Sequence, residues 1–205
     1  MTTELQTPIL RLGRRSDSPE IDLAPLQGLW PVEMYLKLTE HTNQLIEFTD
    51  GEVEILSMPT RRHQRMLAWL YEMFIAHRRP LGGEVLFSAF RLQSRPGKFR
   101  EPDLLLLRDA NDPRNQDAFW LGADLVVEIV SPDDPERDTV TKRADYAEAG
   151  IPEYWIVNPL DATITVLALD GAAYAEHGVF ARGALATSLL LDGFGVSVDE
   201  VFDAA

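Results

Sequence analysis

The chain has 205 residues, with 19 Lys or Arg, 33 Asp or Glu and no Cys, and its formal net charge is −14. This length favours one domain of ordinary size, and 45% hydrophobic residues are enough for a core. The lack of cysteine excludes a disulfide framework and a thiolate metal site. Because the first thirty residues hold no apolar stretch of signal-peptide length, and no run approaches about 18 apolar residues, we expect a cytoplasmic protein without a membrane partner.

The acidic total at first argues against a nucleic-acid partner, because phosphate binding depends on Lys and Arg. The charge is unevenly distributed, however: residues 61–100 carry 9 basic and 2 acidic side chains, a net charge of +7. Such a segment is typical of an anion-binding face or of a solvated surface, and the charge alone leaves both interpretations open.

The first sixty residues indicate an arm, a short helix and a hairpin. Residues 1–28 are poor in aromatics and rich in Pro, Ser and Asp, which predicts a flexible or irregular N-terminal arm before a single domain over residues 29–205. The apolar positions after Pro31 favour a short helix. Two short alternating runs on either side of Asp50-Gly51 predict a hairpin.

The next part indicates a long helix and then several strands. Thr60 is a candidate N-cap for a helix that ends near Arg79, with apolar side chains on one face. Strands are expected within residues 84–92 and 99–107. The run 125–130 is dense in β-branched residues, so we expect a central strand there.

A helix over residues 136–149, ended by Gly150, separates that run from a strand at 153–157. Two strands joined by a helix in this way are typical of a buried parallel pair. The remaining sequence is rich in strand signals up to a short final turn. The pattern therefore predicts an α/β domain with an additional C-terminal β-rich part.

Two carboxylates occupy strand positions that a purely structural sequence would avoid. Asp103 stands directly before the apolar run 104–107, and Glu128 lies inside the run 125–130. Buried carboxylates are usually paired, metal-bound or neutralised. An Asp and a Glu on adjacent strands form an all-oxygen site suited to Mg²⁺ or Mn²⁺. The structural alternatives are that Glu128 faces water and that Asp103 caps a turn.

A third carboxylate, Glu47, lies in the predicted hairpin. A two-residue loop at Asp50-Gly51 pairs Glu47 with Glu54, and this like-charge pair would be destabilising unless a cation relieves it. A surface glutamate that pairs with an arginine is the alternative.

Four basic or titratable side chains crowd the start of the helix after Thr60: Arg61, Arg62, His63 and Arg65. The helix dipole favours acidic side chains there. A phosphate bound by the free N–H groups and the guanidinium groups would explain the cations. For His63, the alternative is a hydrogen bond to the neighbouring strand.

Asp138, Lys142 and Tyr146 are spaced four residues apart and share one helix face. Asp138 and Lys142 could form a surface pair. Because this helix starts soon after Glu128, it must fold back over that strand, so Lys142 could instead point toward the carboxylates and stabilise a phosphoryl transition state.

The ordered motifs are Glu47 before Asp50-Gly51-Glu52, His63 after Ser57-Met58-Pro59, Pro102-Asp103, Val127-Glu128-Ile129-Val130-Ser131-Pro132, Lys142 four residues before Tyr146, and Gly150 to Val157. From about Trp30 to Phe202, this combination resembles the Uma-type restriction endonuclease family, long filed as a domain of unknown function, within the PD-(D/E)XK nuclease superfamily. The resemblance implies a restriction-endonuclease-like core, with a mixed central β-sheet flanked by α-helices and a divalent metal ion.

The resemblance also implies roles for individual residues. Asp103 and Glu128 would hold the metal ion, with the Ile129 carbonyl as a further ligand. The superfamily's lysine normally lies two residues after the acid, where this sequence has Val130. Lys142 matches the position from which this family supplies its lysine, on the next helix.

Glu47 and His63 match other characteristic polar positions of the family, as metal ligand or phosphate contact. The leading hypothesis is a metal-dependent endonuclease that hydrolyses phosphodiester bonds in DNA, with a homodimer to cut both strands. One alternative is a catalytically inactive nuclease-fold module that binds DNA or a protein partner. Another is that the acidic C-terminal half mediates only homo-oligomeric contacts.

Overall fold

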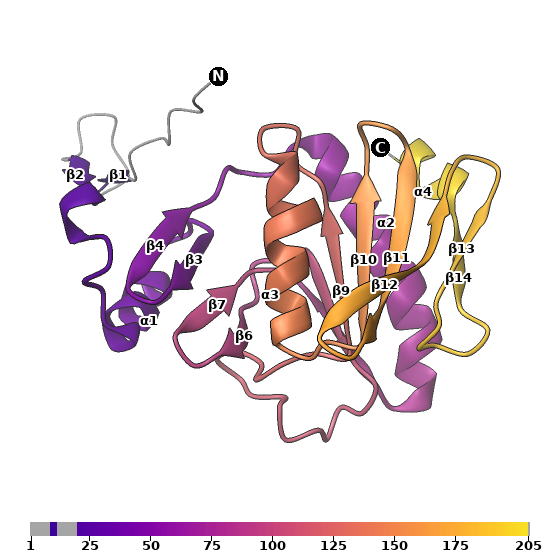
Figure 1. The fold of residues 1–205 in the computed structure, drawn as a ribbon, viewed down its shortest axis with the longest axis horizontal. Coiled ribbons are helices and arrows are strands. Elements are labelled where there is room, and N and C mark those ends of the chain that lie inside the picture. The colour runs from indigo at the N-terminus through magenta and orange to yellow at the C-terminus, as the bar shows by residue number, and fades with distance from the viewer. Residues whose placement is uncertain (1–8, 12–19, 205) are drawn as a thin grey trace. The chain divides into compact units, whose positions relative to one another are not determined.

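The structure, a computed structural model, describes residues 9–11 and 20–204 (Figure 1). It divides into two compact units, which we call unit 1 (residues up to 58, with 96–100) and unit 2 (59–95, with 101 onward). Part of the expected N-terminal arm therefore lies outside the described residues, and both the arm and the single domain stay predictions. Within the described ranges, no helix combines the length and the apolar character needed to cross a membrane.

Unit 1 contains the predicted helix and hairpin. Its elements are β1 (Ile9–Arg11), β2 (Glu20–Asp22), the 3-10 turn η1 (Ala24–Leu26), α1 (Val32–Glu40), β3 (Ile46–Thr49), β4 (Glu52–Ile55) and β7 (Lys98–Arg100). β1 pairs with β2, and β3 pairs with both β4 and β7, always antiparallel. Asp50 and Gly51 both have positive φ, as a two-residue type I′ loop requires. The expected hairpin is therefore confirmed.

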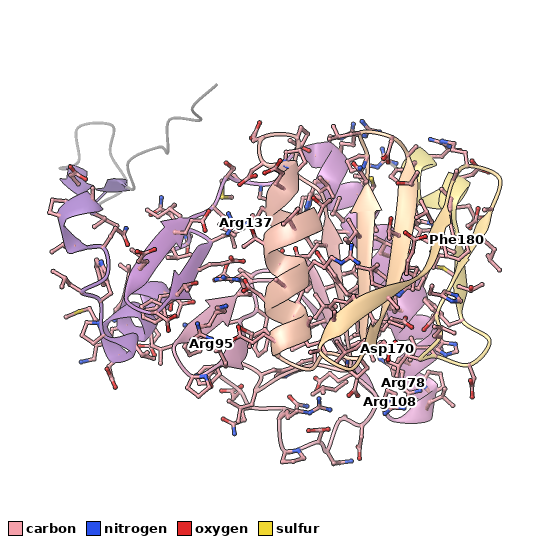
Figure 2. All side chains as sticks on the ribbon, viewed as in Figure 1. Arg78, Arg95, Arg108, Arg137, Asp170 and Phe180 are labelled. Atoms are coloured by element: carbon pink, nitrogen blue, oxygen red, sulfur yellow. The ribbon has the colours of Figure 1, made fainter. Side chains whose placement is uncertain are left out.

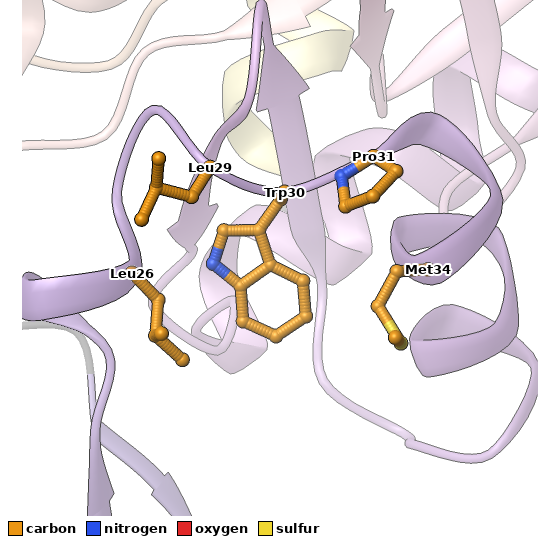
Figure 3. A pocket seen from close by; sticks show the side chains of 5 residues that line it. All are labelled: Leu26, Leu29, Trp30, Pro31 and Met34. Carbon is orange, nitrogen blue, oxygen red and sulfur yellow. The ribbon is translucent and has the colours of Figure 1, made fainter.

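Unit 1 also carries an apolar pocket of about 210 Å³ (Figure 3). Its lining residues are Leu26, Leu29, Trp30, Pro31 and Met34. No charged side chain lines this pocket, so it provides no ligand for a cation and no group for acid–base chemistry.

Unit 2 is built on a six-stranded sheet in the order β12-β11-β10-β9-β8-β5. Its strands are β5 (Glu84–Phe87), β8 (Leu104–Leu107), β9 (Leu125–Ile129), β10 (Glu153–Asn158), β11 (Thr163–Asp170) and β12 (Ala173–Phe180), with β6 (Leu92–Arg95), β13 (Leu185–Thr187) and β14 (Gly195–Ser197) outside it. β9 and β10 run parallel and the other neighbours run antiparallel. The sheet is therefore mixed, and the run 125–130 is central in it, as expected.

Helices cover both faces of this sheet. They are α2 (Arg61–Arg78), the 3-10 turn η2 (Arg79–Leu81), the π-helical turn η3 (Arg137–Thr141), α3 (Lys142–Glu148) and α4 (Val198–Asp203). α3 lies in front of the sheet and α2 behind it (Figure 1). Alternate side chains of β8 follow this division: Leu104 and Leu106 join the core that contains α2 and α4, and Leu105 and Leu107 join the core on the α3 side.

Two expected strands are shorter than the sequence pattern suggested. The expected strand 84–92 ends after β5, because the chain leaves its partner β8 and bonds to Trp120 instead. There, Trp120 N donates to Arg91 O and Gln93 N donates to Trp120 O. The segment 99–107 breaks between β7 and β8, where Pro102 has no N–H to donate to a ladder. The helix expected over 136–149 begins as a π-helical turn, and Gly150 ends it with φ +70°.

Candidate active site

Asp103 and Glu128 meet where β8 and β9 lie side by side. Leu104 pairs with Val127 in the antiparallel ladder, so the continued register places Asp103 opposite Glu128. The Ile129 N–H donates to Asp103 Oδ2 at 2.7 Å. Glu128 is 2% exposed, which excludes the alternative that it faces water. The two carboxylates that stood out in the sequence are therefore neighbours in the fold.

His63 joins this pair from the N-terminus of α2. Thr60 caps the helix, with its Oγ1 accepting the His63 N–H at 3.2 Å, and His63 Nε2 lies 3.2 Å from Asp103 Oδ2. Burial opposes protonation of His63, but the hydrogen bond and charge of Asp103, together with the charge of Asp138, raise its pKa above 6.5. Its Nδ1 is buried without a hydrogen-bond partner in the described part of the chain.

Lys142 lies between two buried carboxylates. Its Nζ is 2.8 Å from Glu128 Oε1 and 3.2 Å from Asp138 Oδ1, and all three side chains are nearly inaccessible to solvent. Tyr146, one helical turn further on, donates its hydroxyl to the same Glu128 Oε1 at 2.5 Å. The lysine thus points inward toward the carboxylates, and the surface pair considered for Asp138 and Lys142 is excluded.

Burial dominates the electrostatics of this cluster. It raises the pKa of Glu128 to about 8, because the Lys142 charge opposes it only in part and the charges of Asp138 and Asp103 reinforce it. Burial also raises the pKa of Asp138, again with Lys142 opposing. Strongly perturbed acids that surround one lysine are typical of functional sites.

Arg61, Arg62 and Arg65 have exposed side chains on the first turns of α2. They belong to the helix end that carries His63. Their role as phosphate contacts stays a prediction.

Other cations of the basic segment 61–100 have structural partners. At the far end of α2, Arg78 Nη2 donates to Arg108 O at 2.5 Å, and Figure 2 shows these two side chains close together. Arg95 Nε lies 3.3 Å from Glu148 Oε1, at the end of α3. The segment's net charge of +7 therefore overstates the positive charge available to a ligand.

Glu47 belongs to unit 1 and lies opposite Glu54, in the register that the hairpin predicted. The cation that relieves this pair is Arg100, whose Nε lies 3.6 Å from Glu47 Oε2 with both side chains buried. Arg100 Nη1 also donates to Thr49 Oγ1 at 2.9 Å. The role of Glu47 as metal ligand or phosphate contact stays a prediction.

Asp138 and Tyr146 were not predicted as site residues, although Asp138 contacts Lys142 and Tyr146 contacts Glu128. The signal was present: their four-residue spacing from Lys142 placed them on its helix face. What the spacing did not show is that Tyr146 reaches Glu128 and that Asp138 is buried.

The donor set fits a divalent cation that keeps most of its water. The described residues contain no group of three or more His, Asp or Glu arranged to hold a metal ion. Mg²⁺ is commonly held by only one or two carboxylates, and Asp103, Glu128 and the Ile129 carbonyl would supply hard oxygen ligands. The protein contacts of the two carboxylates fall on Asp103 Oδ2 and Glu128 Oε1. Asp103 Oδ1 and Glu128 Oε2 therefore remain available within the described part of the chain.

Comparisons with known proteins show the family of this chain and its fold. The Uma2 family model, described as "Putative restriction endonuclease", matches residues 32–199. A crystal structure of "a putative nuclease belonging to DUF820" from Anabaena variabilis ATCC 29413 shares the fold, with a TM-score of 0.70 and 18% identity over 85% of this chain and 99% of that one. No curated protein matches the chain. Because the family model spans most of its length, the chain belongs to the Uma2 family.

Proposed function

We propose that the chain is a divalent-metal-dependent endonuclease that hydrolyses phosphodiester bonds in DNA. The observation that carries the proposal is the cluster on β8 and β9: Asp103 opposite Glu128, with Lys142 Nζ 2.8 Å from the glutamate. Two carboxylates and a lysine are the groups that metal-assisted phosphodiester hydrolysis requires. Membership of a restriction endonuclease family supports the same reaction class.

In this proposal, Asp103, Glu128 and the Ile129 carbonyl hold Mg²⁺ or Mn²⁺. When bound, the ion lowers the pKa of a water ligand and polarises the scissile phosphate. Lys142 brings a positive charge to the cluster, where it orients the attacking water or stabilises charge that develops on the phosphate. Asp138, 3.2 Å away, holds the ammonium group in place.

The positive end of α2 would bind the DNA backbone. The contact with Asp103 raises the pKa of His63, which widens the pH range in which the protonated ring can donate to a phosphate. Arg61, Arg62 and Arg65 are exposed on the same helix end and would contact flanking phosphates. Because the net positive charge is confined to one segment of an acidic chain, we expect weak sequence-independent binding.

The proposal also includes a role for Glu47, a homodimer and a cytoplasmic location. Glu47 would act as an additional ligand or phosphate contact. A homodimer would bring two sites to the two strands of a duplex. We expect the protein to work in the cytoplasm without a membrane partner.

A cleavage assay on double-stranded and single-stranded DNA with Mg²⁺ or Mn²⁺ tests the proposal. Glu128→Gln and Asp103→Asn keep side-chain size but remove the charge, and each should reduce cleavage at least about 100-fold. Glu153→Gln is the matched control, because Glu153 is an equally buried glutamate on β10 whose partners are Trp155, Ser188 and backbone N–H groups. Cleavage that survives excess chelator, or that both site variants retain, would refute the proposal.

One observation favours the inactive binding module as a second candidate. Both site carboxylates already have protein partners, since Asp103 accepts from Ile129 N–H and Glu128 is paired with Lys142. A scaffold that had lost its metal could be stabilised in this way. Calorimetry in which neither Mn²⁺ nor Mg²⁺ binds to the folded protein, beside retained DNA binding, would favour the module.

A further inference from the structure

Three buried tyrosines pack in a row on the α3 side of the sheet. The ring centroids of Tyr146 and Tyr154 are 5.1 Å apart, and those of Tyr154 and Tyr174 are 5.9 Å apart. All three rings belong to the same hydrophobic core. Their environments are therefore closely matched, and what distinguishes them is the destination of each hydroxyl.

Only Tyr146 among the three sends its hydroxyl to a carboxylate. Tyr154 donates to the Asp138 carbonyl at 2.8 Å and Tyr174 donates to the Ile151 carbonyl at 2.7 Å. Tyr146 donates to Glu128 Oε1 at 2.5 Å. The hydroxyls of Tyr154 and Tyr174 donate to backbone carbonyls, as buried tyrosines commonly do. The Tyr146 hydroxyl instead donates to a residue of the candidate site.

The Tyr146 hydroxyl and the Lys142 ammonium converge on one oxygen of Glu128. A carboxylate with a single flexible partner can rotate about its last torsion, but two donors on Oε1 fix its plane. Lys142 has a long flexible stem and, in the proposed mechanism, also serves the phosphate. Tyr146 is held by its ring packing, so it is the donor that keeps the same position throughout the reaction.

We propose that Tyr146 is a positioning residue that orients Glu128 for the metal ion. This inference rests on the proposed function, because it assumes that Glu128 is a metal ligand. By occupying Oε1, the hydroxyl presents to the cation the other oxygen, Oε2, which has no hydrogen bond or ion pair within the described residues. Partners that orient metal ligands in this way typically contribute a factor of about 10 to 100 in metal affinity.

The test compares Tyr146→Phe with Tyr174→Phe in the full chain. Each variant removes one buried tyrosine hydroxyl and keeps its ring, but only the first removes a bond to Glu128. Calorimetric titration with Mn²⁺ should show binding about 10-fold weaker for Tyr146→Phe and unchanged for Tyr174→Phe. In cleavage assays, the Mg²⁺ concentration at half-maximal rate should rise by a similar factor, while the rate at saturating Mg²⁺ stays within about 3-fold of wild type.

A second measurement covers the case in which Tyr146→Phe is less stable than wild type. For each variant, the rise in unfolding temperature on adding Mn²⁺ is measured against the metal-free form of the same variant, and these rises are compared. Equal Mn²⁺ affinity for Tyr146→Phe and wild type would overturn the role of Tyr146. So would an equal loss in Tyr174→Phe, because the effect would then belong to the ring cluster. Failure of the proposed function looks different: wild-type Mn²⁺ binding would be absent or unaffected by Glu128→Gln.

Discussion

Glu128 should make the metal-free protein less stable as the pH rises, and Glu128→Gln should remove this dependence. Burial raises the pKa of Glu128 in the folded chain from 4.5 to about 8. Between these values the folded chain keeps a proton that the unfolded chain has released. Folding therefore becomes less favourable as the pH rises from about 4.5 to about 8.

The magnitude follows from the same two values. The step from 4.5 to about 8 corresponds to about 5 kcal/mol, at 1.36 kcal/mol per pH unit. The assay interval begins at pH 5 and so covers only about 3 of these pH units, which makes about 4 kcal/mol the largest difference that it can show. We expect Glu128→Gln to gain about 2 to 4 kcal/mol relative to wild type between pH 5 and pH 8.5.

Urea unfolding of both proteins at pH 5 and pH 8.5, in the presence of a chelator, measures this difference. Glu153→Gln is the control, because Glu153 is 1% exposed but accepts from Trp155 Nε1, Ser188 Oγ and the N–H groups of Leu189 and Leu190. An amide cannot replace all of these acceptor contacts, so this variant should lose about 2 kcal/mol at both pH values.

The reasoning would be refuted by a free-energy difference between Glu128→Gln and wild type that is the same at both pH values. It would also be refuted if Glu153→Gln gained stability at high pH, because the gain would then follow from replacing any buried glutamate.

Three further predictions concern other parts of the molecule. Asp103→Asn should lower the pKa of His63, which lies above 6.5 because the Asp103 carboxylate outweighs burial, and an unchanged His63 midpoint in an NMR titration would contradict this prediction. In the wild type, the His63–Asp103 pair stabilises the fold below pH 6.5, and this contribution is lost as the pH rises through the raised pKa of His63. Arg100→Met should destabilise the fold by about 3 kcal/mol, because it breaks the buried ion pair with Glu47. A Glu47→Met/Arg100→Met double variant that recovers none of this stability in urea unfolding would show that the pair is not coupled. Gly51→Ala should cost about 2 kcal/mol in thermal unfolding, because φ is +93° and a Cβ would lie 2.7 Å from a backbone oxygen; a variant as stable as wild type would argue against this loop geometry.

Local sequence patterns predicted the elements whose geometry depends on neighbouring residues. The Asp50-Gly51 loop determines the hairpin register, so the Glu47–Glu54 pairing follows from counting. Thr60 caps the start of α2 with its side chain, and Gly150 ends α3 because it adopts a positive φ. The direction of Lys142 follows from the short distance in sequence between β9 and the next helix.

Contacts between distant segments could not be read in this way. The sequence indicated that a cation could relieve the Glu47–Glu54 pair, but not that Arg100 supplies one from β7, which pairs with β3. The same limit explains the early end of β5, because the strand ends where the chain changes its hydrogen-bond partner to Trp120. The π-helical turn before Lys142 was not predicted either, because no feature of its sequence distinguishes it from the start of an α-helix.

The cost of the Asp103–Glu128 cluster is itself an argument for function. Three acidic side chains, including Asp138, surround Lys142 and His63, and burial raises the pKa of two of the acids. Apolar side chains of similar size would pack the same space at lower cost, as Leu105 and Leu107 do on the same face. Glu153 shows that this sheet can bury a carboxylate with a full set of neutral donors. Asp103 and Glu128 instead each accept from a neutral donor on one oxygen, the Ile129 N–H and the Tyr146 hydroxyl. In the proposed function a divalent cation would bind the other oxygens, and it would reverse the local charge even in a chain of net charge −14.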